Sequence, residues 1–139
     1  MAALPGMVQR RRGDIVNVSS VAGFRAAMPG STYGATKAWV THFSESIAPS
    51  VRHARVRVMA LCPGYTRTEL HDRAGINMSR LPDWLWLTAE EVVRDGLRDL
   101  RRGKTLSVPD FKYKLAVFGM RHLPQGLLTG IAKDTRGLD

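Results

Sequence analysis

Tyr33 and Lys37 lie four residues apart in a segment with helical periodicity, so their side chains project from one helix face. A tyrosine phenol has an ordinary pKa of about 10 and is a poor acid or base at neutral pH. A lysine ammonium within about 4–6 Å stabilises the phenolate, and such a pair makes an efficient proton donor and acceptor. Ser20 lies thirteen positions before the tyrosine, and its hydroxyl can donate to a substrate oxygen as negative charge develops there. These residues predict proton transfer at a substrate oxygen.

The alternative is that Tyr33 and Lys37 are ordinary neighbours on a solvated helix surface. Their surroundings favour catalysis. The residues 14–19 and 56–62 have the composition of buried strands, and the second of these is followed by Pro63-Gly64. Ligand sites in open α/β sheets gather at the carboxyl ends of the strands, which is where the serine, the tyrosine–lysine pair and this dipeptide are expected.

The chain alternates predicted strands and helices. A third strand is predicted over 105–108, and helices over 33–52 and from the Thr88–Glu91 capping box to about 103. The first thirteen residues are predicted to be a helix tail with cations at its end and Gly13 as its stop, and the chain from about 111 is weakly helical up to Pro124 and Gly126. This order predicts an α/β fold with a partial, Rossmann-like, doubly wound parallel sheet. Because parallel sheets are covered on both faces, we expect the second half of a larger domain.

Hydrophobic spacing predicts which helical residues face the core. They are Val40, Phe43 and Ile47 in the first long helix, and Val92, Val93, Leu97 and Leu100 in the second. Pro49 is expected to kink the first of these helices or to end it early.

Three motifs resemble the short-chain dehydrogenase/reductase family: Ile-Val-Asn-Val-Ser-Ser20, Tyr33-x-x-x-Lys37 and Pro63-Gly-Tyr-Thr-Arg-Thr68. They are similar to that family's catalytic strand, catalytic helix and cofactor-closing loop, in this order, and the resemblance covers nearly the whole chain from Gly13 onward. It implies an oxidoreductase that transfers a hydride between NAD or NADP and an alcohol or ketone. In that reaction Ser20 orients the substrate oxygen, Tyr33 exchanges the proton, and Lys37 stabilises the phenolate.

The same resemblance implies the cofactor-binding residues. Tyr33 and Lys37 contact the cofactor, and the lysine holds the nicotinamide ribose. The backbone around Thr66 binds the nicotinamide carboxamide, and Thr68 lies nearby on the cofactor. Pro63 and Gly64 are also expected to bind the cofactor.

The family's glycine-rich phosphate loop and active-site asparagine have no counterpart in these 139 residues. We therefore expect a single partial domain over 1–139, the carboxyl-terminal portion of the family's fold: the catalytic strand, helix and cofactor loop in 1–68, a substrate loop in 69–87, and a helix, strand and tail in 88–139. By itself it is expected to bind cofactor poorly. The alternative is a truncated, non-catalytic remnant.

The segment 69–87 lies where the family has its variable substrate loop. Its apolar residues, with Leu70 and Trp84 as the substrate-binding candidates, predict a pocket for a bulky or long-chain carbonyl compound. The alternative is that Trp84, Leu85 and Leu87 pack two helices together. Cys62 is expected to be a small buried residue rather than a reactive thiol.

The net charge of +9, from 21 Lys and Arg against 12 Asp and Glu, permits a nucleic-acid-binding module. Aromatic residues make up 7% of the chain and are not interleaved with a basic patch, so helix-end arginines are the preferred explanation. The basic, amphipathic residues 111–122 allow a peripheral contact with an anionic membrane, a dimer contact or a lid over the substrate.

The remaining expectations concern the cell and the assembly. One cysteine excludes an internal disulfide and fits a reducing, cytoplasmic location. Metal sites are not expected, because the four histidines lack ligand-like spacing: His42, His53, His71 and His122. Family resemblance implies a homodimer or homotetramer that pairs partly through the helix bearing Tyr33.

Overall fold

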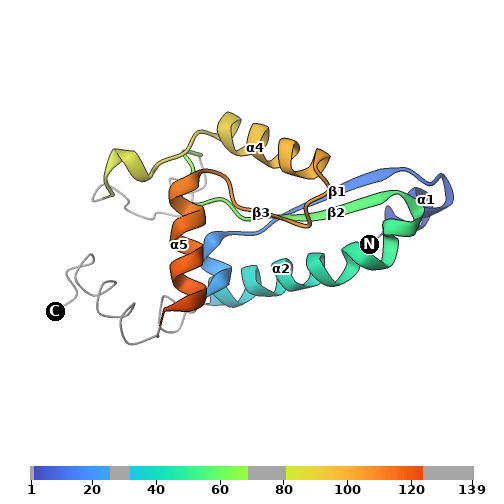
Figure 1. Cartoon of the computed structure of the whole chain (residues 1–139), viewed down its shortest axis with the longest axis horizontal. Coiled ribbons are helices and arrows are strands. Elements are labelled where there is room, and N and C mark those ends of the chain that lie inside the picture. The colour runs from blue at the N-terminus through green and yellow to red at the C-terminus, as the bar shows by residue number, and fades with distance from the viewer. Residues whose placement is uncertain (1, 26–31, 69–80, 124–139) are drawn as a thin grey trace.

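A computed structural model of the chain describes residues 2–25, 32–68 and 81–123 (Figure 1). Its three strands are β1 (Gly13–Val18), β2 (Val56–Leu61) and β3 (Leu106–Ser107), which form one parallel sheet in the order β1-β2-β3. β1 and β2 pair along their whole length, from Gly13 opposite Val56 to Val18 opposite Leu61. The predicted parallel α/β architecture is therefore confirmed.

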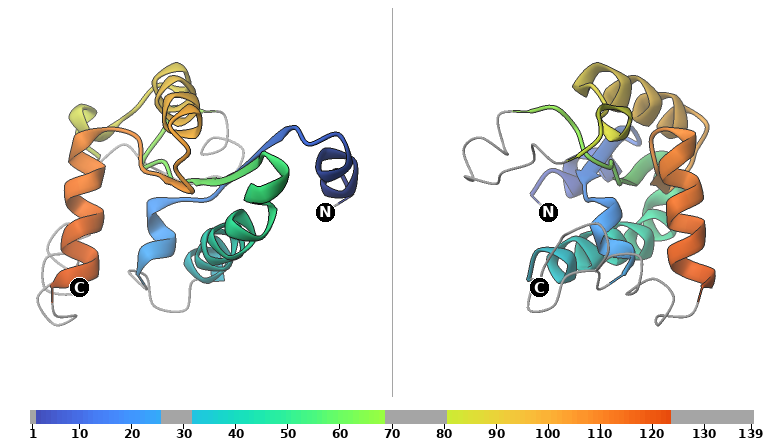
Figure 2. Two further views of the ribbon diagram at one scale, coloured as in Figure 1. Left: turned by 45° about the vertical axis from the view of Figure 1, so that its right-hand side comes forward. Right: turned by 90° about the vertical axis from the view of Figure 1, so that its left-hand side faces the viewer.

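Helices cover both faces of this sheet. The α-helices are α1 (Leu4–Gln9), α2 (Thr32–Val51), α4 (Ala89–Arg101) and α5 (Phe111–His122), and the 3₁₀ turns are η1 (Val21–Phe24), η2 (Arg52–Ala54) and η3 (Asp83–Leu85). Figures 1 and 2 show α2 on one face, α4 on the other, and α5 standing at the carboxyl end of the strands. No helix in the described ranges is long and apolar enough to cross a membrane.

The central strand β2 explains this layering, because all of its residues except Arg57 are apolar and buried. Val56 and Val58 join a cluster with the end of α2, whereas Met59 and Leu61 join a second cluster with α4 and α5. A strand buried on both sides needs helices above and below it, and the two clusters are these two contacts.

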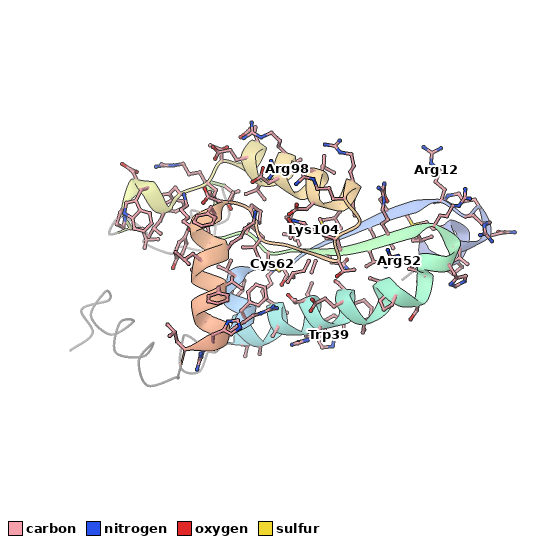
Figure 3. All side chains as sticks on the ribbon, in the orientation of Figure 1. Arg12, Trp39, Arg52, Cys62, Arg98 and Lys104 are labelled. Carbon is pink, nitrogen blue, oxygen red and sulfur yellow. The ribbon has the colours of Figure 1, made fainter. Side chains whose placement is uncertain are left out.

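The face of α2 that contacts the sheet differs from the prediction. Its buried residues are Thr41, Ser44, Ala48 and Val51, whereas the predicted core positions Val40, Phe43 and Ile47 are half-buried. Small side chains bring the helix close to the sheet. Of the predicted residues, Ile47 packs against the core cluster that contains Val56 and Val58. Phe43 instead stacks on the exposed ring of Trp39, which Figure 3 labels, at 4.8 Å between centroids.

Two predicted helix ends are also corrected. Pro49 does not end α2 early, because it lies exposed in the last turn and the helix continues to Val51. Gly13 does not stop α1, since it is already the first residue of β1. Arg11 instead takes the left-handed conformation after the helix, with φ 53°.

The capping box of α4 forms as predicted: the Glu91 amide donates to Thr88 Oγ1 at 3.2 Å, and the Thr88 amide donates to Glu91 Oε2 at 2.9 Å. Val92 and Leu100 are buried, but the prediction that Val93 and Leu97 face the core is wrong.

Gly96 and Asp99 take the inward positions of α4 instead. A Cβ on Gly96 would lie 2.9 Å from Leu61 Cδ1, so glycine allows the helix to approach β2 closely.

Asp99 is a buried carboxylate that joins α4 to β3. It accepts from Lys104 Nζ and from Ser107 Oγ, both at 2.8 Å. Burial by itself raises the pKa of Asp99, but the hydrogen bonds from Lys104 and Ser107 outweigh it and hold that pKa below its ordinary value. The ionised form is therefore the one that the fold stabilises.

Asp99→Asn is expected to lower the free energy of unfolding at neutral pH by about 1–3 kcal/mol, because a buried charge-assisted hydrogen bond is lost. The lowered pKa means that Asp99 stabilises the fold above the ordinary carboxyl pKa and loses this effect as the pH falls through the folded-state value. Urea titrations at neutral and acidic pH should show the difference from the unmodified chain shrinking on acidification. Asp83→Asn, at an exposed ion pair with Arg67, is the matched control. A difference independent of pH would contradict the assignment.

Candidate active site

The end of β1 places Ser20 beside the loop that follows β2. The ladder between the strands continues past both of them: the Ser19 amide donates to Leu61 O at 2.7 Å, and the Val21 amide donates to Pro63 O at 3.0 Å. Ser20 begins η1 as its N-cap, and its Oγ accepts from the Ala22 amide at 3.2 Å. A serine oxygen that accepts in this way keeps its own proton to donate.

η1 lies directly against the first turns of α2, and two glycines make this contact possible. A Cβ on Gly23 would lie 2.7 Å from the backbone of Lys37 and Ala38, and one on Gly34 would lie 3.1 Å from Ala22 O. The turn that begins at Ser20 and the helix that carries the tyrosine–lysine pair are therefore held together by backbone contact.

Tyr33 and Lys37 lie on one face of α2, as their spacing predicts. Lys37 Nζ is 5.6 Å from the centroid of the Tyr33 ring and donates to Val18 O, at the end of β1, at 3.0 Å. The phenol is exposed. The ammonium is thus tethered to the strand end beside an exposed phenol, and it still has two protons to donate elsewhere.

A buried polar network, which the sequence analysis did not identify, holds α2 against β1. Ser19 Oγ donates to Lys37 O at 2.7 Å and lies 2.7 Å from Thr41 Oγ1, which is 3.6 Å from Cys62 Sγ. The network fixes the backbone of Lys37 relative to the strand. Ser19 adjoins the predicted Ser20, but no spacing rule links it to Thr41.

Cys62 lies inside this network, between the sheet and α2 (Figure 3). Burial raises the pKa of the Cys62 thiol, and hydrogen bonds with Thr41 and Ser19 only partly offset this effect. The thiolate is disfavoured, so the prediction of a small buried residue is confirmed.

Tyr113 of α5 holds the predicted cofactor loop and was missed by the sequence analysis, since nothing in its spacing marks it. The Tyr65 amide donates to Tyr113 Oη at 3.0 Å, and that hydroxyl donates to Leu85 O at 2.5 Å. A Cβ on Gly64 would overlap the Tyr113 ring. Burial raises the pKa of Tyr113, so it remains a neutral phenol that donates and accepts.

The loop that contains Pro63, Gly64, Thr66 and Thr68 is joined to the end of the substrate segment. Thr66 forms an isolated parallel bridge with Leu87, the Leu87 amide donates to Tyr65 O at 2.8 Å, and Thr66 Oγ1 donates to Gly64 O at 3.1 Å. Thr68 is the last described residue of this segment. The assignment of these residues to cofactor binding stays a prediction.

The two substrate-binding candidates are not brought into a pocket. Leu70 lies outside the described residues, and Trp84 is 65% exposed in η3, with its carbonyl accepting from Lys112 Nζ at 2.7 Å. Leu87 is buried in the core cluster of α4 and α5, as the packing alternative predicts for that residue.

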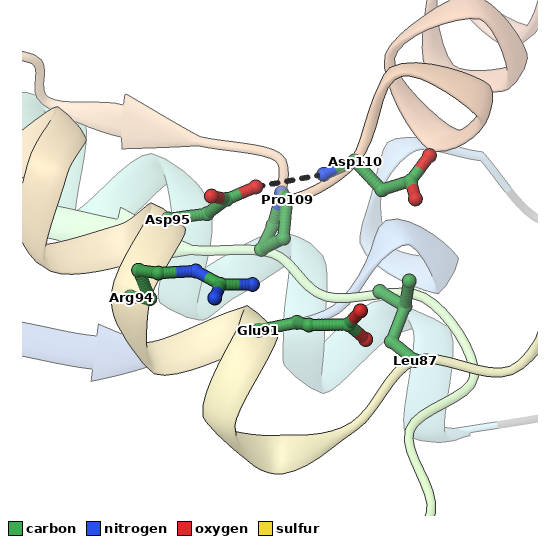
Figure 4. Close-up of a pocket in the computed structure, with 6 residues that line it drawn as sticks. All are labelled: Leu87, Glu91, Arg94, Asp95, Pro109 and Asp110. Atoms are coloured by element: carbon green, nitrogen blue, oxygen red, sulfur yellow. Dashed lines mark hydrogen bonds between the residues drawn. The ribbon is translucent and has the colours of Figure 1, made fainter.

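A small hollow of about 180 Å³ lies between α4 and the start of α5 (Figure 4). It is lined by Leu87, Glu91, Arg94, Asp95, Pro109 and Asp110. It contains no predicted site residue. One carboxylate oxygen of Asp95 accepts a hydrogen bond from the Asp110 amide at 3.4 Å. Its volume is below the roughly 300–1,000 Å³ of ordinary ligand pockets. Within the described residues, no group of three or more His, Cys, Asp or Glu could hold a metal ion.

The family model of short chain dehydrogenases matches residues 1–78. An uncharacterized oxidoreductase of Myxococcus xanthus is 45% identical over 69 residues, which cover 50% of this chain and 27% of that protein. An NADP-dependent 3-hydroxy acid dehydrogenase, YdfG of Salmonella typhi, is 46% identical over 63 residues, 45% of this chain and 25% of that protein. The chain belongs to the short-chain dehydrogenase family, as the three motifs predict.

A solved short-chain dehydrogenase from Sphingobium yanoikuyae, in complex with NADPH, superposes with a TM-score of 0.72 at 34% identity. The match covers 92% of this chain and 49% of that structure. The chain thus spans about half the length of this relative, and the shared half includes the sheet and helices described above.

Tyr113→Phe is expected to lower the free energy of unfolding by about 0.5–1.5 kcal/mol, because the part-buried hydrogen bonds to the Leu85 carbonyl and the Tyr65 amide are lost. Amide hydrogen exchange at Tyr65 should become faster, while exchange in β2 should follow only the change in global stability. Tyr65→Phe, at an exposed ring, is the control and should change neither quantity appreciably. Unchanged exchange at the Tyr65 amide in Tyr113→Phe would show that the phenol does not hold this loop.

Proposed function

We propose that this chain supplies the acid–base half of a nicotinamide-dependent oxidoreductase that interconverts an alcohol and a ketone. The observation that carries the proposal is the position of Lys37. Its ammonium is tethered to Val18 O at the end of β1 and lies beside the Tyr33 ring, while Ser20 begins the turn at the end of the same strand. The tyrosine–lysine pair and the serine therefore both lie at the carboxyl end of β1, where open α/β sheets bind ligands, and this supports the proposal.

The residues have separate roles in this reaction. Ser20 donates its hydroxyl proton to the substrate oxygen and orients it. Tyr33 transfers a proton to that oxygen when the ketone is reduced, and takes it back when the alcohol is oxidised. Lys37 stabilises the phenolate that remains. The bound nicotinamide cofactor supplies or accepts the hydride at the substrate carbon.

The residues present fit the nicotinamide end of such a cofactor. Lys37 Nζ uses one of its three protons on Val18 O, so it can also donate to a ribose hydroxyl. Tyr113 fixes the Pro63–Thr68 loop through the Tyr65 amide, and we expect the backbone of this loop to bind the carboxamide. The solved relative with NADPH and the NADP-dependent relative support a nicotinamide cofactor.

The phosphates of this cofactor require residues beyond those in the sequence. The 139 residues contain no glycine-rich GxGxxG loop, which is the usual backbone cradle for a pyrophosphate. The choice between NAD and NADP therefore depends on a part of the fold that this sequence does not contain.

The outer face of α2 supports the proposed homo-oligomer, a dimer or tetramer. Trp39 is 63% exposed and stacks on Phe43, which gives a rigid apolar surface on the helix that bears Tyr33. Rigid aromatic side chains are enriched at protein interfaces.

In an enzyme that joins this chain to a cofactor-binding half, Tyr33→Phe is expected to lower kcat by at least about 100-fold, because the proton donor is lost. The Kd for the cofactor should stay nearly unchanged, whereas Lys37→Ala should raise this Kd and lower kcat as well. Steady-state kinetics and cofactor titration measure both quantities, with Val93→Ala, at an exposed residue of α4, as a control that retains activity. Normal turnover of Tyr33→Phe would refute the proton-transfer assignment.

The 139-residue chain alone is expected to bind NADPH weakly, at millimolar concentrations or above, since the phosphates have no cradle in it. Titration followed by the fluorescence of the reduced nicotinamide tests this expectation, with Lys37→Ala as the matched variant. Tight binding would contradict the view that the phosphate site lies outside this sequence.

A further inference from the structure

Helix α5 carries apolar side chains on two faces, and one of these faces is exposed. Tyr113 and Val117 are buried against the core. Phe111, Leu115 and Phe118 are 77%, 61% and 61% exposed. Their spacings of four and three residues align them on one side of the helix, and we call these three residues the outer stripe. Packing of α5 in the fold therefore does not account for the three apolar side chains of the outer stripe.

Cations border the outer stripe on both sides. At about 100° per residue, Lys114 and Arg121 fall on one side of it and Lys112 on the other. No acidic residue occurs between Phe111 and His122, and Asp110, which caps the helix, precedes the stripe. An apolar stripe with basic borders is the pattern of helices that lie in the interface of a lipid bilayer.

Two of these cations, Lys112 and Arg121, have contacts that fix their side chains next to the outer stripe. Lys112 Nζ donates to Trp84 O at 2.7 Å and lies 3.5 Å from Asp110 Oδ2, and the Arg121 guanidinium lies 4.7 Å from the centroid of the Phe24 ring. Lys114 is exposed. Within the described residues, Lys112 is the one of these three cations that forms an ion pair with a carboxylate, so the border keeps a net positive charge.

We propose that the outer stripe of α5 binds the surface of a membrane rich in anionic lipids. The twelve-residue helix is about 18 Å long, too short to span a hydrocarbon core of about 30 Å, so it lies parallel to the surface. The stripe enters the headgroup boundary while Lys112, Lys114 and Arg121 meet lipid phosphates.

Charge favours lipid over a second copy of the chain at this surface. The chain has a net charge of +9, and pairing two such helices would bring their basic borders together. An anionic lipid surface instead attracts each cation. This contact is independent of the proposed catalysis, since the outer stripe contains none of the residues assigned to it.

Co-flotation of the full 139-residue chain with vesicles tests the proposal. Vesicles of phosphatidylcholine and phosphatidylglycerol in equal parts should carry the chain, vesicles of phosphatidylcholine alone should not, and added salt should release it. Leu115→Glu and Phe118→Glu should each weaken partitioning at least about tenfold, because an apolar side chain is lost from the lipid. Lys114→Glu should weaken it about fivefold or more.

Val93→Glu is the matched control, because Val93 is an exposed apolar residue on α4, and it should bind as the unmodified chain does. Thermal unfolding followed by circular dichroism checks that each variant remains folded. Failure of the unmodified chain to bind anionic vesicles, or unchanged binding of Phe118→Glu, overturns the proposal. So does a dimer in lipid-free solution that Phe118→Glu abolishes, since that result assigns the outer stripe to a second copy.

Discussion

The candidate site depends on one constraint, the parallel pairing of β1 with β2 beyond the ends of both strands. The hydrogen bonds from the Ser19 and Val21 amides to Leu61 O and Pro63 O carry the two chain segments onward side by side. Because the backbone of one strand end is fixed to that of the other, the predicted catalytic serine and the predicted cofactor loop meet at one edge. The Lys37 ammonium, bonded to Val18 O, brings α2 to the same edge.

The motifs and the strands were predictable because both are local. The β-branched residues of β1 and β2, the capping box of α4 and the tyrosine–lysine spacing need no knowledge of distant residues. The inward faces of the helices were harder to predict. On α2 the hydrophobic pattern favoured Val40, Phe43 and Ile47. The buried positions include Thr41 and Ser44, whose hydroxyls hydrogen-bond to Ser19 and Asn17 at the strand. On α4, Asp99 is buried because Lys104 and Ser107 satisfy it, which hydrophobic spacing cannot reveal.

Long-range hydrogen bonds account for the residues that sequence reasoning missed. Tyr113 reaches the loop at Tyr65 across 48 positions, and Ser19 reaches Thr41 across 22. Each is a polar group whose burial is tolerable only with a partner, and each partner lies on another element. The Ser20 and Tyr33–Lys37 motifs are the predicted source of the chemistry. The buried hydroxyls of Thr41 in α2 and Tyr113 in α5 hold the neighbouring backbone in place.

The place of β1 at the end of the sheet order has a consequence for handling the protein. Within the described residues no strand pairs with its outer side, and Val18 is 59% exposed there. An open strand edge with apolar side chains is a template to which further strands add, and addition of identical chains leads to aggregates. An uncovered β1 edge is therefore a place where chains can pair with one another even when the core of each is folded.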